Sequence, residues 1–214
     1  MPPAMPPTTQ RQLKFHRFDP DDRKDQLVRA ALRCLMAEGH TGLSVRRIAK
    51  EAEVSQGLVN HHFGSVDALV GRAYEILASE LLQSLEEGIL AAPQTAAGRL
   101  DALITGTFSS KVLDPELLSA WIVFWSLVRH SAEIDEIHTN TYQTYVAMLR
   151  SLISDLITAE NLQVRDLRLA SIGLSALLDG LWLEGCLNSH IFTADDAINI
   201  CRGWVEGLRR GVFA

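Results

Sequence analysis

The chain has 214 residues and a mass of 23.7 kDa, enough to bury a core as one domain or as a small module plus a larger one. Hydrophobic residues make up 47% of it and charged residues 21%, which excludes an intrinsically disordered chain. The net charge of −6 alone argues against a nucleic-acid partner, yet residues 1–72 hold 11 Lys and Arg against 8 Asp and Glu. This asymmetry fits a protein that offers one end to phosphate groups, and it also fits an ordinary solvated surface.

Cysteine usage and apolar runs bear on the compartment. Cys34, Cys186 and Cys201 are far apart and form no C-x-x-C pair, so neither a disulfide framework nor a zinc site is indicated. We expect each to be a small apolar residue of a helix in a reducing cytosol. The N-terminus lacks the apolar run of a signal peptide, and no uninterrupted apolar stretch reaches the roughly 18–20 residues of a membrane span. The sequence therefore predicts a cytoplasmic protein with no membrane partner, no metal site and no cofactor.

The first elements in chain order are a tail and a helix. Four prolines among the first seven residues make a helix unfavourable there, so residues 1–19 are predicted to be a flexible tail. From Asp19 onward the apolar residues recur at helical spacing, as at Leu27, Ala31 and Leu35, and Gly39 is placed to end this helix.

Residues 44–63 read SVRRIAKEAEVSQGLVNHHF. Ser44 and Ser55 are each placed to cap a short helix, and Glu53 with Val54 would form the turn between the two helices. Apolar residues at Ile48, Ala49, Val54, Val59 and Phe63 supply the packing side. Two short helices joined by a tight turn are what a helix-turn-helix requires, in which the second helix enters the major groove of DNA.

The rest of the chain is also predicted to be helical. Gly64 and Ser65 break the chain before a long helix to about Leu90, and the next helix is expected to begin at Pro93. Asp114-Pro115-Glu116 is a strong helix start, because proline fits the first helical position and acids suit the positive helix end. Further helices are predicted at about 131–158, 164–188 and 194–212, the last opened by Thr193 and Asp195. About nine helices and no strand give an all-α fold.

The pattern of residues 44–63 resembles the TetR family of regulators. Matching positions are Ser44, Ile48, Ala49, Val54, Ser55, Gly57, His62 and Phe63, and the similarity extends over roughly residues 20–72. The resemblance implies a three-helix DNA-binding domain at 20–66 and a ligand-binding and dimerisation domain at 67–214.

The resemblance also implies which residues meet DNA. Phosphate or groove-edge contacts are expected from the second helix, and base contacts from the third, where Leu58 can touch a thymine methyl. The expected set is Ser44, Arg46, Arg47, Ser55, Gln56, Gly57, Leu58, Asn60, His61 and His62. Taken one at a time, these residues would be read as a solvated helix face. A metal site at His61 and His62 is not expected, because adjacent helical residues point about 100° apart.

Two positions depart from the family pattern. Asn60 stands where tyrosine is usual, and Val66 stands where lysine is usual. Without the lysine, one phosphate contact per subunit would be lost, which would lower the salt dependence of DNA binding by about one unit.

Aromatic residues mark the second part of the chain. Within AWIVFWSLVRH, Trp121, Phe124 and Trp125 fall on one helical face. Tyr142 and Tyr145 lie on the next helix, and Trp182 lies on the eighth. Aromatic faces that converge with a carboxylate can hold quaternary ammonium groups. The other reading is that these aromatics only fill a helical core.

The AW-x-x-FW and LLDGLW segments resemble the C-terminal domain of BetI-type regulators, a choline-responsive TetR subgroup. The resemblance covers roughly residues 115–190 with gaps and implies a small cationic effector. Asp179 carries added weight, because a carboxylate on a largely apolar helix needs a partner or a ligand.

The last two helices, at about 164–212, have apolar stripes too broad to be covered by the two helices alone. A four-helix bundle between two copies would bury them, so a homodimer through these helices is predicted. Gly173, Gly180 and Gly185 would permit close approach there.

The sequence as a whole favours a homodimeric, ligand-responsive repressor that binds a palindromic operator, and not an enzyme. No metalloprotease, nucleophile-elbow or phosphate-loop motif is present. Two alternatives remain open. One is an enzyme with an aromatic helical pocket, and the other is a helical small-molecule-binding protein without DNA-binding activity.

Overall fold

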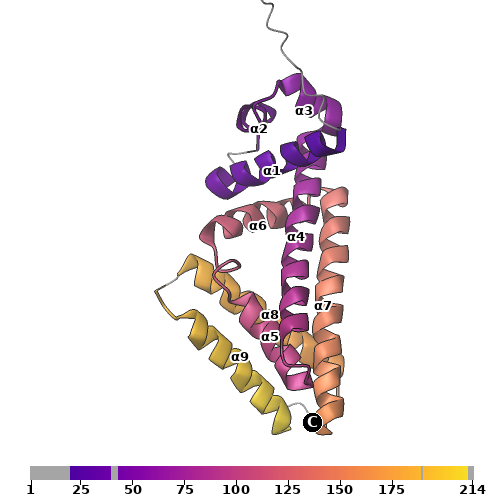
Figure 1. The fold of residues 1–214 in the computed structure, drawn as a ribbon, viewed down its shortest axis with the longest axis vertical. Coiled ribbons are helices and arrows are strands. Elements are labelled where there is room, and N and C mark those ends of the chain that lie inside the picture. The colour runs from indigo at the N-terminus through magenta and orange to yellow at the C-terminus, as the bar shows by residue number, and fades with distance from the viewer. Residues whose placement is uncertain (1–19, 40–42, 189, 212–214) are drawn as a thin grey trace, which may run out of the picture.

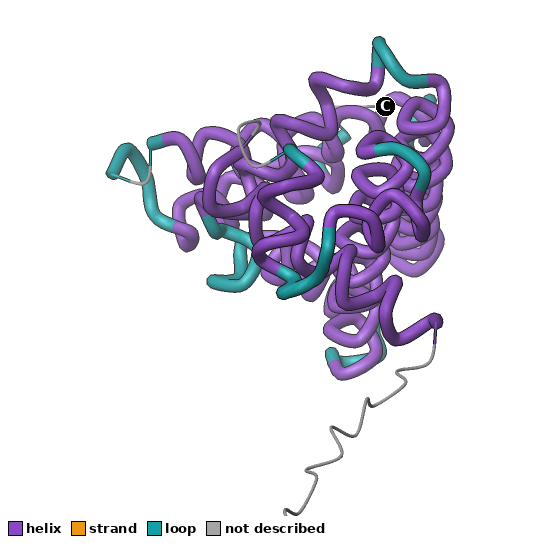
Figure 2. Tube along the Cα trace, turned by 90° about the horizontal axis from the view of Figure 1, so that it is seen from above, coloured by secondary structure: helices purple, strands orange, loops and turns teal. Residues whose placement is uncertain are grey.

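The computed structural model describes residues 20–39, 43–188 and 190–211, and these residues form helices without a strand (Figure 2). The predicted tail, residues 1–19, lies outside the described residues. The helices are α1 (Pro20–Glu38), α2 (Val45–Glu51), α3 (Gln56–Phe63), α4 (Val66–Ala91), α5 (Ala96–Thr107), α6 (Pro115–Val128), α7 (Ala132–Glu160), α8 (Leu167–Leu187) and α9 (Ala194–Arg209). The predicted all-α fold with nine helices is confirmed for this part of the chain.

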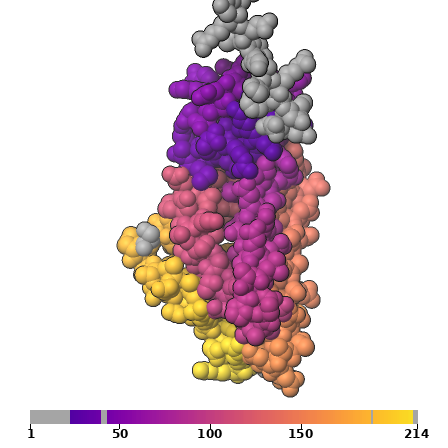
Figure 3. Space-filling view, viewed as in Figure 1, coloured from indigo at the N-terminus to yellow at the C-terminus, as the bar shows by residue number. Residues whose placement is uncertain are grey.

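The helices are arranged along the long axis of the molecule (Figure 1). Helices α1–α3 form one end, which caps the longer remainder in the space-filling view (Figure 3). Helix α4 leaves this end and runs beside α7 toward the other end, while α6 crosses next to α1. Helices α8 and α9 lie side by side at the far end, with α9 outermost. Helices α4, α6 and α7 thus reach both the α1–α3 end and the remainder.

Side-chain caps define the helix starts that the sequence predicts. The hydroxyl of Ser44 accepts from the Arg47 amide at 3.1 Å, and that of Ser55 accepts from the Leu58 amide at 3.3 Å. At α6, Asp114 is the cap and Pro115 is the first helical residue, as expected. Gly39 follows α1 with a φ of +57°, a conformation that glycine adopts without the Cβ clash.

The start of α5 differs from the prediction. The helix begins at Ala96 and not at Pro93, because the Thr95 hydroxyl accepts from the Gly98 amide at 3.0 Å and so supplies the cap. Proline at a first helical position was the misleading signal, since it fits many turns as well. At α9, Thr193 caps as predicted, and its partner in a capping box is Asp196.

The buried residues form two separate hydrophobic cores. The upper core joins α1, α2 and α3 to the first half of α4, to Ala120, Val123 and Phe124 of α6, and to Ile134 of α7. The lower core joins the end of α4 to α5, α7, α8 and α9. Trp121 packs against both cores. The upper core thus continues past residue 66, the predicted domain boundary, into helices that also build the rest of the molecule.

The structure also shows where the three cysteines and the most apolar helix lie. Cys34, Cys186 and Cys201 are buried helix residues with free thiols, as expected. Helix α8 is long and apolar enough to cross a membrane by length and composition, and 39% of its most apolar window is buried. A core helix has the same composition, and α8 packs on α7 and α9, so its apolarity is weak evidence for a membrane span.

Candidate functional site

The turn between α2 and α3 is tight and hydrogen-bonded. Glu53 has a φ of +55°, in the left-handed region, and the Val54 amide donates to the Ala49 carbonyl at 2.9 Å. Ile48, Ala49 and Val59 are buried in the upper core and hold the two helices together. The helix-turn-helix predicted from the sequence is present.

The predicted base-contacting residues lie on the outer surface of α3. Gln56, Gly57, Asn60 and His61 are exposed, while Leu58 is half-buried. Next to them, Ser55 is exposed and His62 is half-buried. Desolvation lowers the pKa of the His62 imidazole, and the nearby His61, Lys24 and Arg23 lower it further. This face is polar and uncovered by the described residues.

The two arginines of α2 differ. Arg46 is exposed and has no ion-pair partner among the described residues. Arg47 is half-buried; its guanidinium donates to Glu38 at the end of α1, with Nε at 2.6 Å, and lies 3.7 Å from Glu51. The hydrogen bond from Arg47 lowers the pKa of the Glu38 carboxyl. Arg46 is therefore available to a phosphate, whereas Arg47 already ties α2 to α1.

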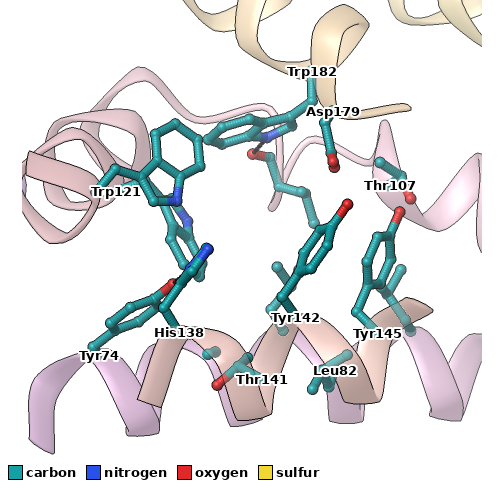
Figure 4. Close-up of a pocket in the computed structure, with 15 residues that line it drawn as sticks. Tyr74, Leu82, Thr107, Trp121, His138, Thr141, Tyr142, Tyr145, Asp179 and Trp182 are labelled. Carbon is teal, nitrogen blue, oxygen red and sulfur yellow. Dashed lines mark hydrogen bonds between the residues drawn. The ribbon is translucent and has the colours of Figure 1, made fainter. Parts of the chain in front are cut away.

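A cavity of about 310 Å³ lies between the two cores. Helices α4, α5, α6, α7 and α8 all contribute to its wall, and Figure 4 shows the side chains turned into it (Figure 4). The lining residues are Tyr74, Ala78, Leu81, Leu82, Leu85, Thr107, Val112, Trp121, Trp125, His138, Thr141, Tyr142, Tyr145, Asp179 and Trp182. The wall therefore gathers residues that are far apart in the sequence.

Three tryptophans form one side of this cavity. The ring centroids of Trp121 and Trp125 are 6.1 Å apart, and the Trp125 ring meets the Trp182 ring edge to face at 6.1 Å. The Trp182 indole N–H donates to the Val112 carbonyl at 2.7 Å, which fixes the ring. Trp125 is 40% exposed and Trp182 is 8% exposed, so the cavity is open to solvent on the Trp125 side.

Asp179 carries the one carboxylate of the cavity wall. Its Oδ2 accepts from the Ser175 hydroxyl at 3.3 Å, and Ser175 is in turn 3.2 Å from the Tyr142 hydroxyl. The residue stays solvent-exposed, yet desolvation of its carboxyl among aromatic side chains raises its pKa to about 6, opposed by the Ser175 hydrogen bond. Burial and the neighbouring Asp179 raise the pKa of Tyr145. None of the lining residues is Lys or Arg.

The structure places the aromatic residues in two different roles. Trp121, Trp125, Tyr142, Tyr145, Asp179 and Trp182 line the cavity together. Phe124 does not reach it: its ring is fully buried in the upper core and stacks on Tyr74 at 4.6 Å, because its position on α6 faces α1 and α4. Helical spacing groups Phe124 with the tryptophans, but only the packing of α6 shows which of them turn inward.

Sequence reasoning missed four polar cavity residues, Tyr74, Thr107, His138 and Thr141, and the first and third of these contact each other. The Tyr74 hydroxyl lies 2.7 Å from His138 Nδ1, and the two residues come from α4 and α7. Each stands alone on its own helix in a pattern that the apolar spacing dominates. No local signal in the sequence links residues 64 positions apart.

The α8–α9 pair leaves apolar side chains uncovered. Leu169, Ile172 and Ile200 are about half-exposed, and Leu187 at the end of α8 is 53% exposed. A Cβ on Gly173 would lie 3.7 Å from the Trp204 ring, so this glycine borders α9, whereas Gly180 faces open space. Dimerisation through this surface stays a prediction.

Both the N-terminal and the C-terminal part of the chain match models of known protein families. Residues 27–73 match the model described as bacterial regulatory proteins of the tetR family. Residues 96–210 match the model of the C-terminal region of BetI-type transcriptional repressors. The chain is similar to the HTH-type transcriptional regulator BetI of Vibrio parahaemolyticus, with 29% identity over 87% of this chain and 92% of the relative. It is 28% identical to BetI of Stenotrophomonas maltophilia over 86% of this chain and 91% of the relative.

Solved structures agree with this fold. A protein of Pseudomonas aeruginosa PAO1, described as a transcriptional regulator, shares 41% identity with a TM-score of 0.85 and covers 95% of this chain and 98% of its own. A regulator from Saccharomonospora viridis in complex with choline has a TM-score of 0.77 at 17% identity, covering 87% and 96% of the two chains. FadR from Bacillus subtilis in complex with stearoyl-CoA has a TM-score of 0.68 at 21% identity, covering 87% and 98%.

Proposed function

The chain belongs to the TetR family and has a BetI-type repressor C-terminal domain, and we propose that it is a cytoplasmic homodimer that binds a palindromic operator and responds to a small organic cation. TetR-type regulators bind DNA and small-molecule effectors.

The exposed face of α3 supports the DNA-binding part. Gln56, Asn60 and His61 are the base-reading candidates, and an asparagine or glutamine can make two hydrogen bonds to adenine. Arg46 and the N-termini of α2 and α3 are the candidates for contacts with the DNA phosphates. Two such helices in a dimer would meet successive major grooves about 34 Å apart.

The cavity supports a cation more than any other ligand class. Its wall combines three tryptophans, three tyrosines and a histidine with one carboxylate, and it contains no Lys or Arg. Each cation–π contact contributes about 0.5–2 kcal/mol when it is desolvated. The single observation that carries this proposal is that Asp179 lines the same cavity as Trp121, Trp125 and Trp182, because a carboxylate repels an anion and attracts a quaternary ammonium group.

An acyl-CoA effector is the competing ligand class, since a neighbour of the same fold holds stearoyl-CoA. The mainly apolar wall would suit an acyl chain. The absence of Lys and Arg among the lining residues speaks against the anionic part of such a ligand.

Titration calorimetry with three ligands separates these classes. Choline is the cation, 3,3-dimethyl-1-butanol is its neutral isostere, and stearoyl-CoA represents the acyl class. We expect choline to bind at least about 10-fold more tightly than the neutral isostere, because only the cation gains the ring and carboxylate attraction. Equal binding of the two small ligands, or preferential binding of stearoyl-CoA, would contradict the cation proposal.

The repressor part is tested with DNA selected from a random library by the purified protein. The selected sites are expected to be palindromic, and choline is expected to release them in a gel-shift titration. Sedimentation of the full chain checks the dimer: Ile172→Asp should shift it toward the monomer, whereas the exposed Leu90→Asp on α4 should not. A monomeric wild type that binds single half-sites would refute the dimer.

A further inference from the structure

We propose that the Tyr74–His138 hydrogen bond couples occupancy of the cavity to the position of the DNA-binding helices, with Tyr74 as the positioning residue. This inference rests on the proposed repressor function. It concerns one contact, the 2.7 Å distance between the Tyr74 hydroxyl and His138 Nδ1, which joins α4 to α7.

Tyr74 belongs to the upper core and to the cavity wall at the same time. The residue is 2% exposed, its ring stacks on Phe124 at 4.6 Å with an interplanar angle of 6°, and its edge meets Trp121 at 5.3 Å. Phe124 lies in the same core as the buried residues of α1, α2 and α3. A displacement of the Tyr74 ring therefore acts directly on the packing that holds the helix-turn-helix.

His138 connects the pair to a more exposed part of the cavity wall. Its imidazole lines the cavity and stacks on Tyr142 at 6.0 Å with an interplanar angle of 14°. Tyr142 is 44% exposed and faces the open part of the cavity. A ligand seated against this wall displaces the imidazole, and a hydrogen bond weakens steeply once its distance and angle leave the favourable range.

The other polar contacts of the cavity lead elsewhere. The Tyr142–Ser175–Asp179 chain ends on α8, and the Trp182 indole donates to Val112, so both fix parts of the lower core. Within the described parts of the chain, Tyr74–His138 is the interhelical hydrogen bond that links a cavity-lining side chain to the upper core. Helix α4 begins at Val66, immediately after α3 and the Gly64-Ser65 link, so its position is passed on to the recognition helix.

The hydroxyl of Tyr74 is suited to a permanent contact. Burial raises the pKa of its phenol to about 12, so the group stays protonated at physiological pH. Tyr74→Phe removes the hydroxyl and keeps the ring that packs on Phe124. The substitution therefore separates the hydrogen bond from the packing.

The experiment measures operator affinity without effector, choline affinity of the free protein, and choline affinity of the operator-bound protein. The ratio of the last two is the coupling factor, which is about 5–150-fold in allosteric proteins. For Tyr74→Phe we expect operator affinity without effector to fall about 3–10-fold and the coupling factor to fall at least about 5-fold, while choline affinity of the free protein stays within about 3-fold.

Two further variants complete the design. Asp155→Asn weakens the 2.8 Å ion pair between Arg99 of α5 and Asp155 of α7, in the lower part of the molecule, because it removes the negative charge. It therefore controls for a weakened contact between α7, the helix of His138, and a neighbouring helix. It should lower the melting temperature without changing the coupling factor. His138→Asn keeps an acceptor near the position of Nδ1 and should restore part of the coupling that His138→Leu removes.

The outcomes decide between coupling and ordinary structural support. If Tyr74→Phe changes only the melting temperature, with operator affinity and coupling factor within about 2-fold of the wild type, the inference is overturned. If choline fails to bind the wild type, the cation proposal fails, and the operator affinities of Tyr74→Phe and Asp155→Asn still decide: a loss confined to Tyr74→Phe supports the inference, and equal values overturn it.

Discussion

The helix-turn-helix and the aromatic cavity differ in how far apart their parts lie in the sequence. Between Ser44 and Phe63, caps, turn and packing residues are all neighbours, and the structure forms them as the sequence predicts. The cavity needs Tyr74, Trp121, Asp179 and Trp182, which come together only when α4, α6, α7 and α8 have packed. A DNA-reading surface can thus be specified locally, whereas a ligand site of this kind is a product of the whole fold.

The largest effect is expected at two adjacent residues of α6, Phe124 in the upper core and Trp125 in the cavity wall. Phe124→Ala should lower the free energy of unfolding by about 3–5 kcal/mol, because it empties a fully buried ring position in the upper core. Trp125→Ala, at a 40% exposed position, should leave most of that stability and weaken choline binding at least about 10-fold. Urea denaturation and calorimetry measure the two quantities. Comparable losses of stability would show that Phe124 and Trp125 do not differ in their contribution to the core.

A pH titration sharpens the comparison on the cavity side. The pKa of Asp179 is raised to about 6, and a quaternary ammonium ion prefers the ionised carboxyl, so choline affinity should fall as the pH drops below 6 and level off above 7. Between pH 7.5 and 5 we expect a loss of about 10-fold. The stability of the ligand-free protein should change with pH in the opposite direction. Because folding raises the pKa of Asp179, this carboxyl adds to the free energy of unfolding below its unfolded pKa, and that contribution is lost as the pH rises through 6.

Asp179→Asn is the control for this titration. The variant should bind choline more weakly at pH 7.5 and lose most of the pH dependence. Operator affinity without effector, measured over the same range, should not follow the same curve. A pH dependence that survives intact in Asp179→Asn would show that Asp179 is not its source.

On the DNA side, the two arginines of α2 are expected to separate. Arg46→Ala should weaken binding to all sequences and reduce the slope of log affinity against log salt by about one unit per subunit. Arg47→Ala should change the slope less, because Glu38 already pairs with this guanidinium. Glu38→Gln removes the charge of the nearer partner of Arg47, leaving Glu51 at 3.7 Å, and should steepen the slope. Equal slopes for both alanine variants would show that the ion pair between Arg47 and Glu38 breaks when the protein binds DNA.

The smallest effect is expected at Val66, where the family usually has lysine. Val66→Lys should steepen the salt slope by about one unit per subunit, since it adds a cation at the first residue of α4. The side chain also packs against the upper core, so a small loss of stability accompanies the gain. Val66→Met, which adds length without charge, is the matched control. An unchanged slope would place this position away from the phosphates.

The extent of what could be predicted follows the same division. Caps at Ser44, Ser55 and Asp114 act within one helical turn, so their patterns are readable in the sequence, and the misplaced start of α5 shows the limit where proline fits both a turn and a helix. Six of the seven predicted ligand-binding residues reach the cavity wall, because apolar spacing identifies the inner faces of helices. The sequence could not show that Phe124 lies in the core or that Tyr74 and His138 line the cavity, since their positions depend on how helices distant in the sequence cross.

The extension of the upper core into α6 and α7 also matters for building hybrid regulators. A transplant of residues 20–66 onto another ligand-sensing scaffold would leave behind Ala120, Val123, Phe124 and Ile134, which complete the packing under α1. Such a graft would expose the underside of the donor module unless the host supplied equivalent side chains. A hybrid that also takes the first half of α4 and these four residues from the donor would keep the upper core complete.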